Sequence, residues 1–205
     1  DADETLAAAT LYICALGYGK VSVNGKPATD EGLMTISGWT NNERMNYFET
    51  YDLTAHMREA SLVHGGSMVL GVSLGHGWRD QSKFPRKDLK EKIAKGDEID
   101  KVFRAVLTTT SVDGTVTVLT STAAPDWSAA AGPVTSDGTY DGETYDARKE
   151  MPGWDVAGFA EDEAWAPAPV ITDGPRGKME ASSMPPVALD RVVKPIGITN
   201  PSPGT

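Results

Sequence analysis

"ATLYICALGYGKVSVNGK", residues 9–26, decides the fold class of this chain. Apolar and polar residues alternate in two β-rich runs that flank a Gly-Tyr-Gly turn, as is typical of strands. The Asn24-Gly25 pair predicts a hairpin, because both residues tolerate the positive φ angles of a tight turn. Cys14 is the only cysteine and lies in an apolar run. The sequence therefore predicts a buried free thiol and excludes an intrachain disulfide.

Strand patterns recur along the rest of the chain. The clearest lie at residues 44–54, 67–75, 101–110 and 115–122, the last two flanking an Asp113-Gly114 turn. Shorter strands are predicted around residues 140–148, 168–172, 178–183 and 193–199. The predicted helix covers residues 86–99, in which Leu89 and Ile93 are spaced i,i+4. Many short strands with one short helix indicate an all-β fold, a single antiparallel β-sandwich.

Composition excludes two classes of partner. The chain has 205 residues and a formal net charge of -10, which repels nucleic acid because phosphate binding needs clustered Lys and Arg. No run approaches the roughly 18 apolar residues of a membrane span. The Pro- and Gly-rich residues 200–205 are interpreted as a linker or a domain boundary.

The stretch "YDGETYDAR", residues 140–148, concentrates ionisable groups and raises the question of paired catalytic carboxylates. In a strand, Glu143 and Asp146 would point to opposite faces, which is poor geometry for flanking one glycosidic bond. Arg148 lies two residues beyond Asp146 and would share its face, so we expect an ion pair between them. The pattern favours a structural network here over a ligand contact.

Metal and aromatic candidates are weaker. His56, His64 and His76 form no short-range pair, so a zinc site is not expected. Calcium is a more open alternative, with ligands drawn from Asp137, Asp141 and Glu143, although Asp-Gly pairs are more often turns. Three tryptophans stand beside turns and could stack on a sugar ring or plug the sandwich: Trp39, Trp78 and Trp154. The sequence has no G-x-S-x-G nucleophile motif and no phosphate-binding glycine loop.

The order of motifs resembles one family. "LYICALGYGKVSVNGKPA", "GWTNNERMNYFETYDLT", "LGVSLGHGWRD", "YDGETYDARKEMPGWDVAGF" and "MPPVALDRVVKPIGI" follow one another, and "GETYDAR" followed by "PGWD" is the most specific part. Over residues 8–199 the chain is similar to the N-terminal β-sandwich domain of bacterial-type α-L-rhamnosidases. It departs from that pattern after "GHGW", where Arg79-Asp80 leads into a charged segment up to Asp100.

The resemblance implies a jelly-roll-like β-sandwich over residues 1–199. Enzymes of this family remove terminal α-L-rhamnose with inversion, using acidic residues on a separate (α/α)6 barrel, so no catalytic residue is assigned to this chain. The resemblance implies partners among rhamnose-containing glycans and the downstream domains of a parent hydrolase. An extracellular or periplasmic location is favoured, and no cofactor is assigned apart from the calcium alternative.

Three functional readings follow. In the first, the chain is a non-catalytic carbohydrate-associated domain whose contacts are Trp78, Arg79, Asp141, Glu143, Tyr145, Asp146 and Arg148. The tryptophan would stack on sugar, the carboxylates would accept hydroxyl hydrogen bonds, and arginine would orient the carboxylates. In the second, the chain is a structural scaffold that braces the catalytic barrel. The third, an independent hydrolase, is disfavoured because no workable acid–base pair is evident.

Overall fold

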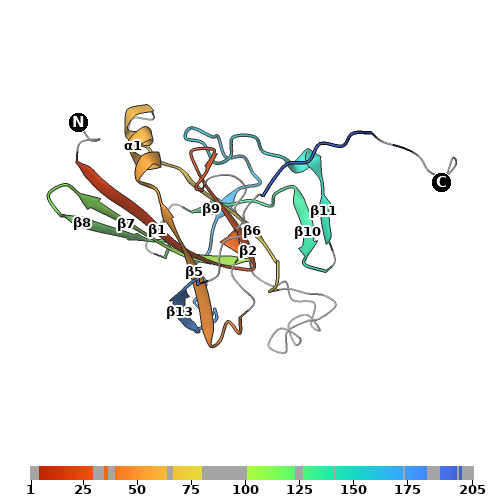
Figure 1. The fold of residues 1–205 in the computed structure, drawn as a ribbon, viewed down its shortest axis with the longest axis horizontal. Helices are drawn as coiled ribbons and strands as arrows, with labels where there is room; N and C mark the ends of the chain where they lie inside the picture. The colour runs from red at the N-terminus through yellow and green to blue at the C-terminus, as the bar shows by residue number, and fades with distance from the viewer. Residues whose placement is uncertain are drawn as a thin grey trace.

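The computed structural model describes residues 5–29, 35–36, 40–63, 67–79, 101–122, 127–140, 142–172, 174–183, 190–197 and 199. Two main β-sheets pack around a shared core, and one α-helix lies beside them (Figure 1). This confirms the predicted all-β sandwich. The predicted helix at residues 86–99 and the segment 200–205 lie outside the described residues.

The larger sheet has the strand order β13-β5-β1-β7-β8. Its strands are β1 (Leu6–Leu16), β5 (Met45–Asp52), β7 (Val102–Ser111), β8 (Val116–Thr120) and β13 (Lys178–Ala181). The central strand β1 is antiparallel to both β5 and β7, and Leu11 pairs with Tyr51 on one side and Leu107 on the other. Strand β13 runs parallel to β5, a local departure from the expected antiparallel pattern.

The second sheet is centred on β2. It contains β2 (Tyr18–Val23), β3 (Lys26–Pro27), β4 (Thr35–Ile36) and β6 (Leu70–Gly75). Two short antiparallel pairs complete the described strands: β9 (Ser128–Ala129) with β12 (Ala166–Pro167), and β10 (Val134–Gly138) with β11 (Gly142–Tyr145). The β10–β11 hairpin stands at the side of the molecule opposite the β7–β8 hairpin (Figure 1).

Both predicted glycine turns in the first strands occur, with different roles. Asn24 (φ 48°) and Gly25 (φ 79°) form the tight turn from β2 to β3, as predicted. Gly17 (φ 108°) instead carries the chain from β1 in one sheet to β2 in the other. A Cβ at Gly17 would lie 2.3 Å from the carbonyl oxygen of Gly75, so the crossing requires glycine.

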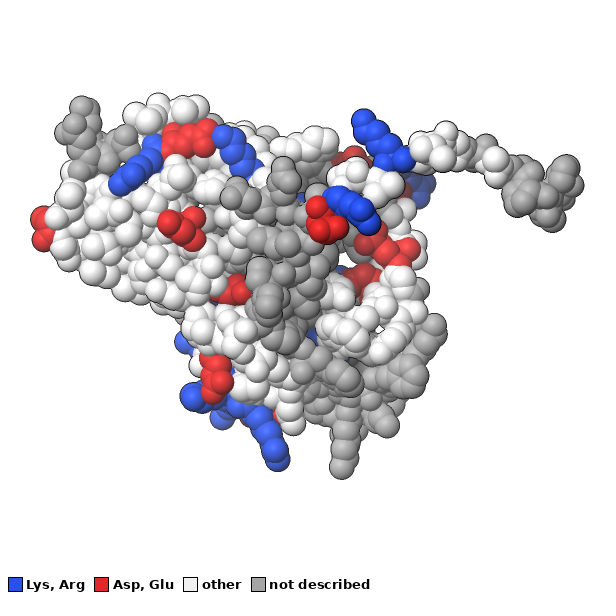
Figure 2. Space-filling view, viewed as in Figure 1, with Lys and Arg blue, Asp and Glu red and all other residues white. Residues whose placement is uncertain are grey.

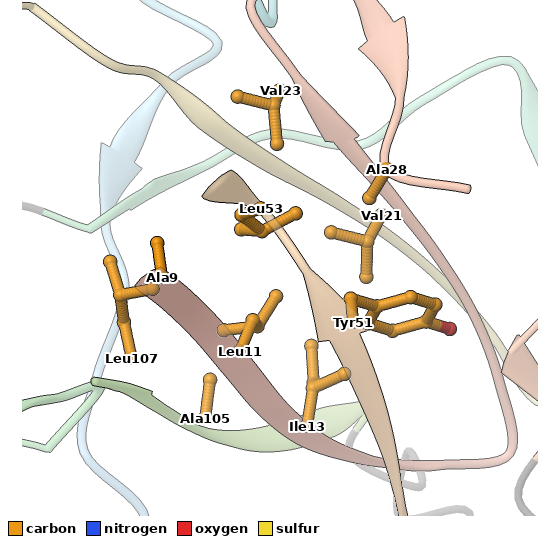
Figure 3. Packing of buried hydrophobic residues seen from close by; sticks show 10 residues of the cluster. All are labelled: Ala9, Leu11, Ile13, Val21, Val23, Ala28, Tyr51, Leu53, Ala105 and Leu107. Atoms are coloured by element: carbon orange, nitrogen blue, oxygen red, sulfur yellow. The ribbon is translucent and has the colours of Figure 1, made fainter. Parts of the chain in front are cut away.

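The core lies between the two sheets. Alternate side chains of β1, including Leu11 and Ile13, point toward Val21 and Val23 of β2 (Figure 3). Cys14 points to the other face of β1 and is buried, which confirms the predicted free thiol. Burial raises the pKa of the Cys14 thiol to about 11, although the charges of Arg104 and Arg79 act in the opposite direction.

The α-helix α1 (Thr54–Val63) was not predicted from the sequence. The Asp52 carboxylate accepts a hydrogen bond from the Thr54 amide at 2.9 Å, which supports the first turn. Arg58 donates from Nη2 to the Leu6 carbonyl at 3.0 Å, and Ala60 is buried. Met57 also packs against the core, so tertiary contacts stabilise this short helix. No helix in the described ranges is long and apolar enough to cross a membrane.

Two predicted strands are wrong. Residues 168–172 form no strand, and neither do the described residues of 193–199, where Ile196 is fully exposed. Each run contains a proline, Pro169 or Pro195, which has no N–H to donate to a sheet. The β-branched residues of these runs were therefore a misleading signal.

Candidate functional site

The loop after β6 and the β10–β11 hairpin meet through one carboxylate. Asp137 on β10 accepts hydrogen bonds at Oδ1 from the amides of His76 (2.7 Å) and Gly77 (3.1 Å). Its Oδ2 lies 3.2 Å from Nδ1 of His76, and both side chains are largely buried. Residues 76–79, called the His76 loop below, are thus tied to a hairpin that lies some 60 residues further along the chain.

Aromatic side chains complete this junction. The ring of Trp78 meets that of Tyr140 edge to face, with centroids 5.7 Å apart. The Tyr18 hydroxyl lies 3.2 Å from Oγ1 of Thr139, so β2 also contacts the hairpin end. Tyr140 is 56% exposed, whereas Trp78 is partly buried. Tyr140, on the hairpin, is therefore exposed to solvent at this junction, and the Trp78 ring of the His76 loop packs against it.

The glycines of "GHGW" make this close approach possible. Gly77 has φ 52°, and a Cβ there would lie 2.9 Å from the ring of Tyr18. A Cβ at Gly75 would lie 3.1 Å from Oδ1 of Asp137. Side chains at these two positions would push the loop away from Tyr18 and Asp137.

Arg79 turns toward the interior. Its Nε and Nη1 atoms are shielded from solvent, and its charge acts on the Cys14 thiol of β1. The Arg79 amide donates to the His76 carbonyl at 2.9 Å, closing the loop as a tight turn. Contact between Arg79 and a sugar stays a prediction. In the structure, part of the Arg79 guanidinium group is shielded from solvent and its charge acts on Cys14.

The side chains of β11 point outward. Glu143 pairs in register with Asp137 and is exposed, and Tyr145 pairs with Val134 and is 51% exposed. The Tyr145 hydroxyl donates to Oε1 of Glu150 at 2.5 Å. That hydrogen bond raises the pKa of Tyr145.

Asp146 and Arg148 form the predicted ion pair. Nε and Nη2 of Arg148 donate to the two carboxylate oxygens at 2.8 and 2.7 Å. The Arg148 hydrogen bond lowers the pKa of Asp146, and the same contact raises the pKa of Arg148. The local geometry differs from the prediction, because Asp146 caps the short 3-10 helix η1 (Ala147–Lys149) and is not part of a strand. Asp146 is therefore held by a partner of its own.

The structure thus brings part of the predicted site together. Trp78 lies against the hairpin that carries Glu143 and Tyr145, and Asp146 with Arg148 follows directly after β11. Asp141 lies outside the described residues. Sequence reasoning missed His76, Tyr140 and the anchoring role of Asp137. The available signal was the pair of glycines that flank His76, which marks a backbone held close to other groups.

The described residues do not supply a set of ligands for the calcium alternative. They contain no group of three or more His, Cys, Asp or Glu residues placed to hold a metal ion. Oδ1 of Asp137 accepts the amides of His76 and Gly77, and Oδ2 lies 3.2 Å from Nδ1 of His76. Calcium at Asp141 and Glu143 stays a prediction.

The remaining tryptophans serve packing where they are described. Trp154 stacks on Trp165 with centroids 6.3 Å apart, and Phe159 meets Trp165 edge to face at 5.7 Å. A Cβ at Gly71 of β6 would lie 2.9 Å from the Trp154 ring, so this aromatic group covers the second sheet. Trp154 therefore packs on the face of the second sheet that carries Ser22, opposite the core face of Val21 and Val23. Trp39 lies outside the described residues.

Comparisons with known proteins point to one family. A family model described as the α-L-rhamnosidase N-terminal domain matches residues 4–191. An α-L-rhamnosidase of Streptomyces avermitilis is 31% identical over 198 residues, which are 96% of this chain and 17% of that protein. An α-L-rhamnosidase of Alteromonas sp. is 32% identical over 176 residues, which are 80% of this chain and 16% of that protein.

Solved structures agree. The α-L-rhamnosidase from Dictyoglumus thermophilum superposes with a TM-score of 0.74 at 26% identity, over 97% of this chain and 20% of that one. The Streptomyces avermitilis α-L-rhamnosidase complexed with L-rhamnose gives a TM-score of 0.58 at 30% identity, over 80% of this chain and 14% of that one. The chain spans a fifth or less of the length of these relatives. Since the family model matches most of its residues, the chain belongs to the α-L-rhamnosidase N-terminal domain family.

Proposed function

We propose that this chain is a non-catalytic, carbohydrate-contacting domain of an α-L-rhamnosidase-like protein. The observation that carries the proposal is the exposed ring of Tyr140, supported from behind by Trp78 on a loop that Asp137 fixes. Trp78 and Tyr140, whose rings meet edge to face, are called the aromatic pair below. Rhamnose is a 6-deoxy sugar, so it offers a methyl group and C–H bonds to such a face.

Polar groups suited to hydroxyl recognition stand beside the aromatic pair. Glu143 lies on the same hairpin as Tyr140 and is exposed, so its carboxylate is free to accept hydrogen bonds from a sugar. Sugar sites in proteins combine an apolar surface with a few placed polar groups. The relatives named above are α-L-rhamnosidases, which makes rhamnose-containing glycans the ligand class to test.

Replacing Tyr140 with alanine should weaken binding of L-rhamnose about fivefold, because an aromatic contact of this kind contributes about 1 kcal/mol. Titration of the chain with L-rhamnose by calorimetry, with and without calcium, gives the affinity. Tyr12→Ala is the matched control, since Tyr12 is also partly exposed and also packs edge to face, on Phe48 of the larger sheet at 5.9 Å. An equal loss of affinity in both variants, or no saturable binding at millimolar sugar, would contradict the proposal.

The chain alone should not hydrolyse an aryl α-L-rhamnoside, and Glu143→Gln should leave that background unchanged. Glu143 is exposed, and the nearby Asp146 is held by Arg148, so the two carboxyl groups do not form an acid–base pair. A release assay for the aryl group checks this. Hydrolysis by the purified chain that Glu143→Gln abolishes would show an independent hydrolase instead.

A second candidate is the interdomain scaffold, which one observation favours. Strand β8, at the end of the larger sheet, has no charged residue, and its valines Val116 and Val118 are 59% and 55% exposed. Figure 2 shows few charged side chains over the region of β7 and β8, apart from the hairpin tip. Uncharged edge strands are usually covered in folded proteins. Another domain of a longer chain, of the length seen in the relatives, would provide that cover.

A further inference from the structure

The geometry of the His76 loop points to a role for Asp137 that goes beyond sugar contact. Its carboxylate is largely buried and accepts two backbone N–H groups from the loop, at 2.7 and 3.1 Å. Hydrogen bonds to an ionised acceptor are stronger than neutral ones, and two amides converging on one oxygen fix the loop backbone in direction as well as position. The next residue after those two amides is Trp78.

The same hairpin holds the other half of the aromatic pair. Tyr140 lies three residues beyond Asp137, and its ring meets Trp78 at 5.7 Å. Thr139 contacts the Tyr18 hydroxyl at 3.2 Å, while the backbone of Gly77 packs on the ring of Tyr18. The His76 loop is therefore enclosed by Tyr18 on one side and by Asp137 on the other, with no space for a side chain at Gly77.

We propose that Asp137 is the positioning residue of the aromatic pair: it sets where Trp78 stands relative to Tyr140, and through that the sugar affinity. This rests on the proposed carbohydrate contact at the pair. Asp137 itself faces amides and His76, so it acts through the loop and does not touch sugar. A purely structural carboxylate would alter stability and leave the geometry of the pair and its affinity unchanged.

The test compares Asp137→Ala, Asp137→Asn and the control Asp113→Ala. Asp113 also accepts a backbone amide, from Thr115 at 2.9 Å, but in the β7–β8 turn away from the site. NMR follows the indole N–H signal of Trp78, assigned with Trp78→Phe, and hydrogen exchange at the amides of His76 and Gly77. Calorimetry gives the affinity for L-rhamnose.

Asp137→Ala is expected to shift the Trp78 signal, to speed exchange at both amides about tenfold or more, and to weaken rhamnose binding about tenfold. Asp137→Asn, which keeps one acceptor oxygen, should show smaller changes of each kind, and Asp113→Ala none. An unshifted Trp78 signal with unchanged affinity in Asp137→Ala would overturn the inference. If Asp137→Ala does not fold, Asp137→Asn decides in the same way. If the unaltered chain does not bind rhamnose, the proposed function fails, while the Trp78 signal and amide exchange still judge the positioning role.

Discussion

Replacing Gly17 with alanine is expected to lower the free energy of unfolding by about 3 kcal/mol or more. Gly17 has φ 108°, a conformation that a residue with a Cβ adopts only with strain. The new methyl group would also lie 2.3 Å from the Gly75 carbonyl oxygen and 2.5 Å from that of His76. The His76 carbonyl belongs to the His76 loop and Gly75 directly precedes it, so the substitution should disturb the candidate site as well as the crossing between sheets. Urea unfolding followed by circular dichroism measures the loss.

Gly114→Ala is the control that separates the backbone strain of a positive φ from the steric clash of a new Cβ with its neighbours. Gly114 also has a positive φ, 85°, but nothing lies within 4 Å of a Cβ built there. It should cost only about 1–2 kcal/mol, the penalty of the left-handed conformation alone. Equal losses in the two variants would contradict the close packing of Gly17 against the His76 loop.

Replacing Leu11 with alanine should lower the free energy of unfolding by about 3–5 kcal/mol. Leu11 is fully buried at the centre of β1, paired with Tyr51 and Leu107 and facing the second sheet (Figure 3). The cost combines lost burial with a cavity that a sandwich core cannot readily close. A total stability of about 5–15 kcal/mol is usual for a domain, so a large fraction would be lost.

The matched control is Leu119→Ala, the same change on the same sheet. Leu119 pairs with Leu107 but is 56% exposed on the edge strand β8. We expect a loss of about 1 kcal/mol or less there, as for most exposed positions. A comparable loss at both leucines would mean that the core is not centred on β1.

Local signals in the sequence were sufficient for much of the sandwich. The turns at Asn24-Gly25 and Asp113-Gly114 both occur. Asn24 and Gly25 both have positive φ angles, whereas in the second turn Gly114 has a positive φ and Asp113 does not. Strand patterns also predicted β5 and β7, and in β7 the buried residues Ala105 and Leu107 are spaced by two. The local turn signals were therefore confirmed, whereas the β-branched runs at residues 168–172 and 193–199 were not.

Tertiary contacts explain what was missed in the fold. Helix α1 depends on the Asp52 carboxylate at its start and on the hydrogen bond from Arg58 to the Leu6 carbonyl. Among the described residues of the helix, only Ala60 is buried. The crossing at Gly17 depends on the backbone of Gly75, far along the chain. Neither contact leaves a periodic pattern in the sequence.

The candidate site shows the same division. The Asp146–Arg148 pair is local and was predicted from spacing alone. The anchoring of the His76 loop by Asp137 spans some 60 residues and needs the fold to bring the two segments together. Trp78 was chosen for its aromatic chemistry, but its partner Tyr140 could be identified only from the structure.

Carbohydrate contact at the aromatic pair is tested most directly by an NMR titration of the isotope-labelled chain with L-rhamnose, which reports whether sugar binds and where. We expect saturable shifts in the assigned amide signals of residues 76–79 and 139–145, and no shift in β8. Calcium added in a parallel titration tests the Asp141 and Glu143 alternative. Absence of saturable shifts at millimolar sugar in a folded chain, or shifts confined to another surface, would contradict carbohydrate contact at the aromatic pair and leave the scaffold candidate.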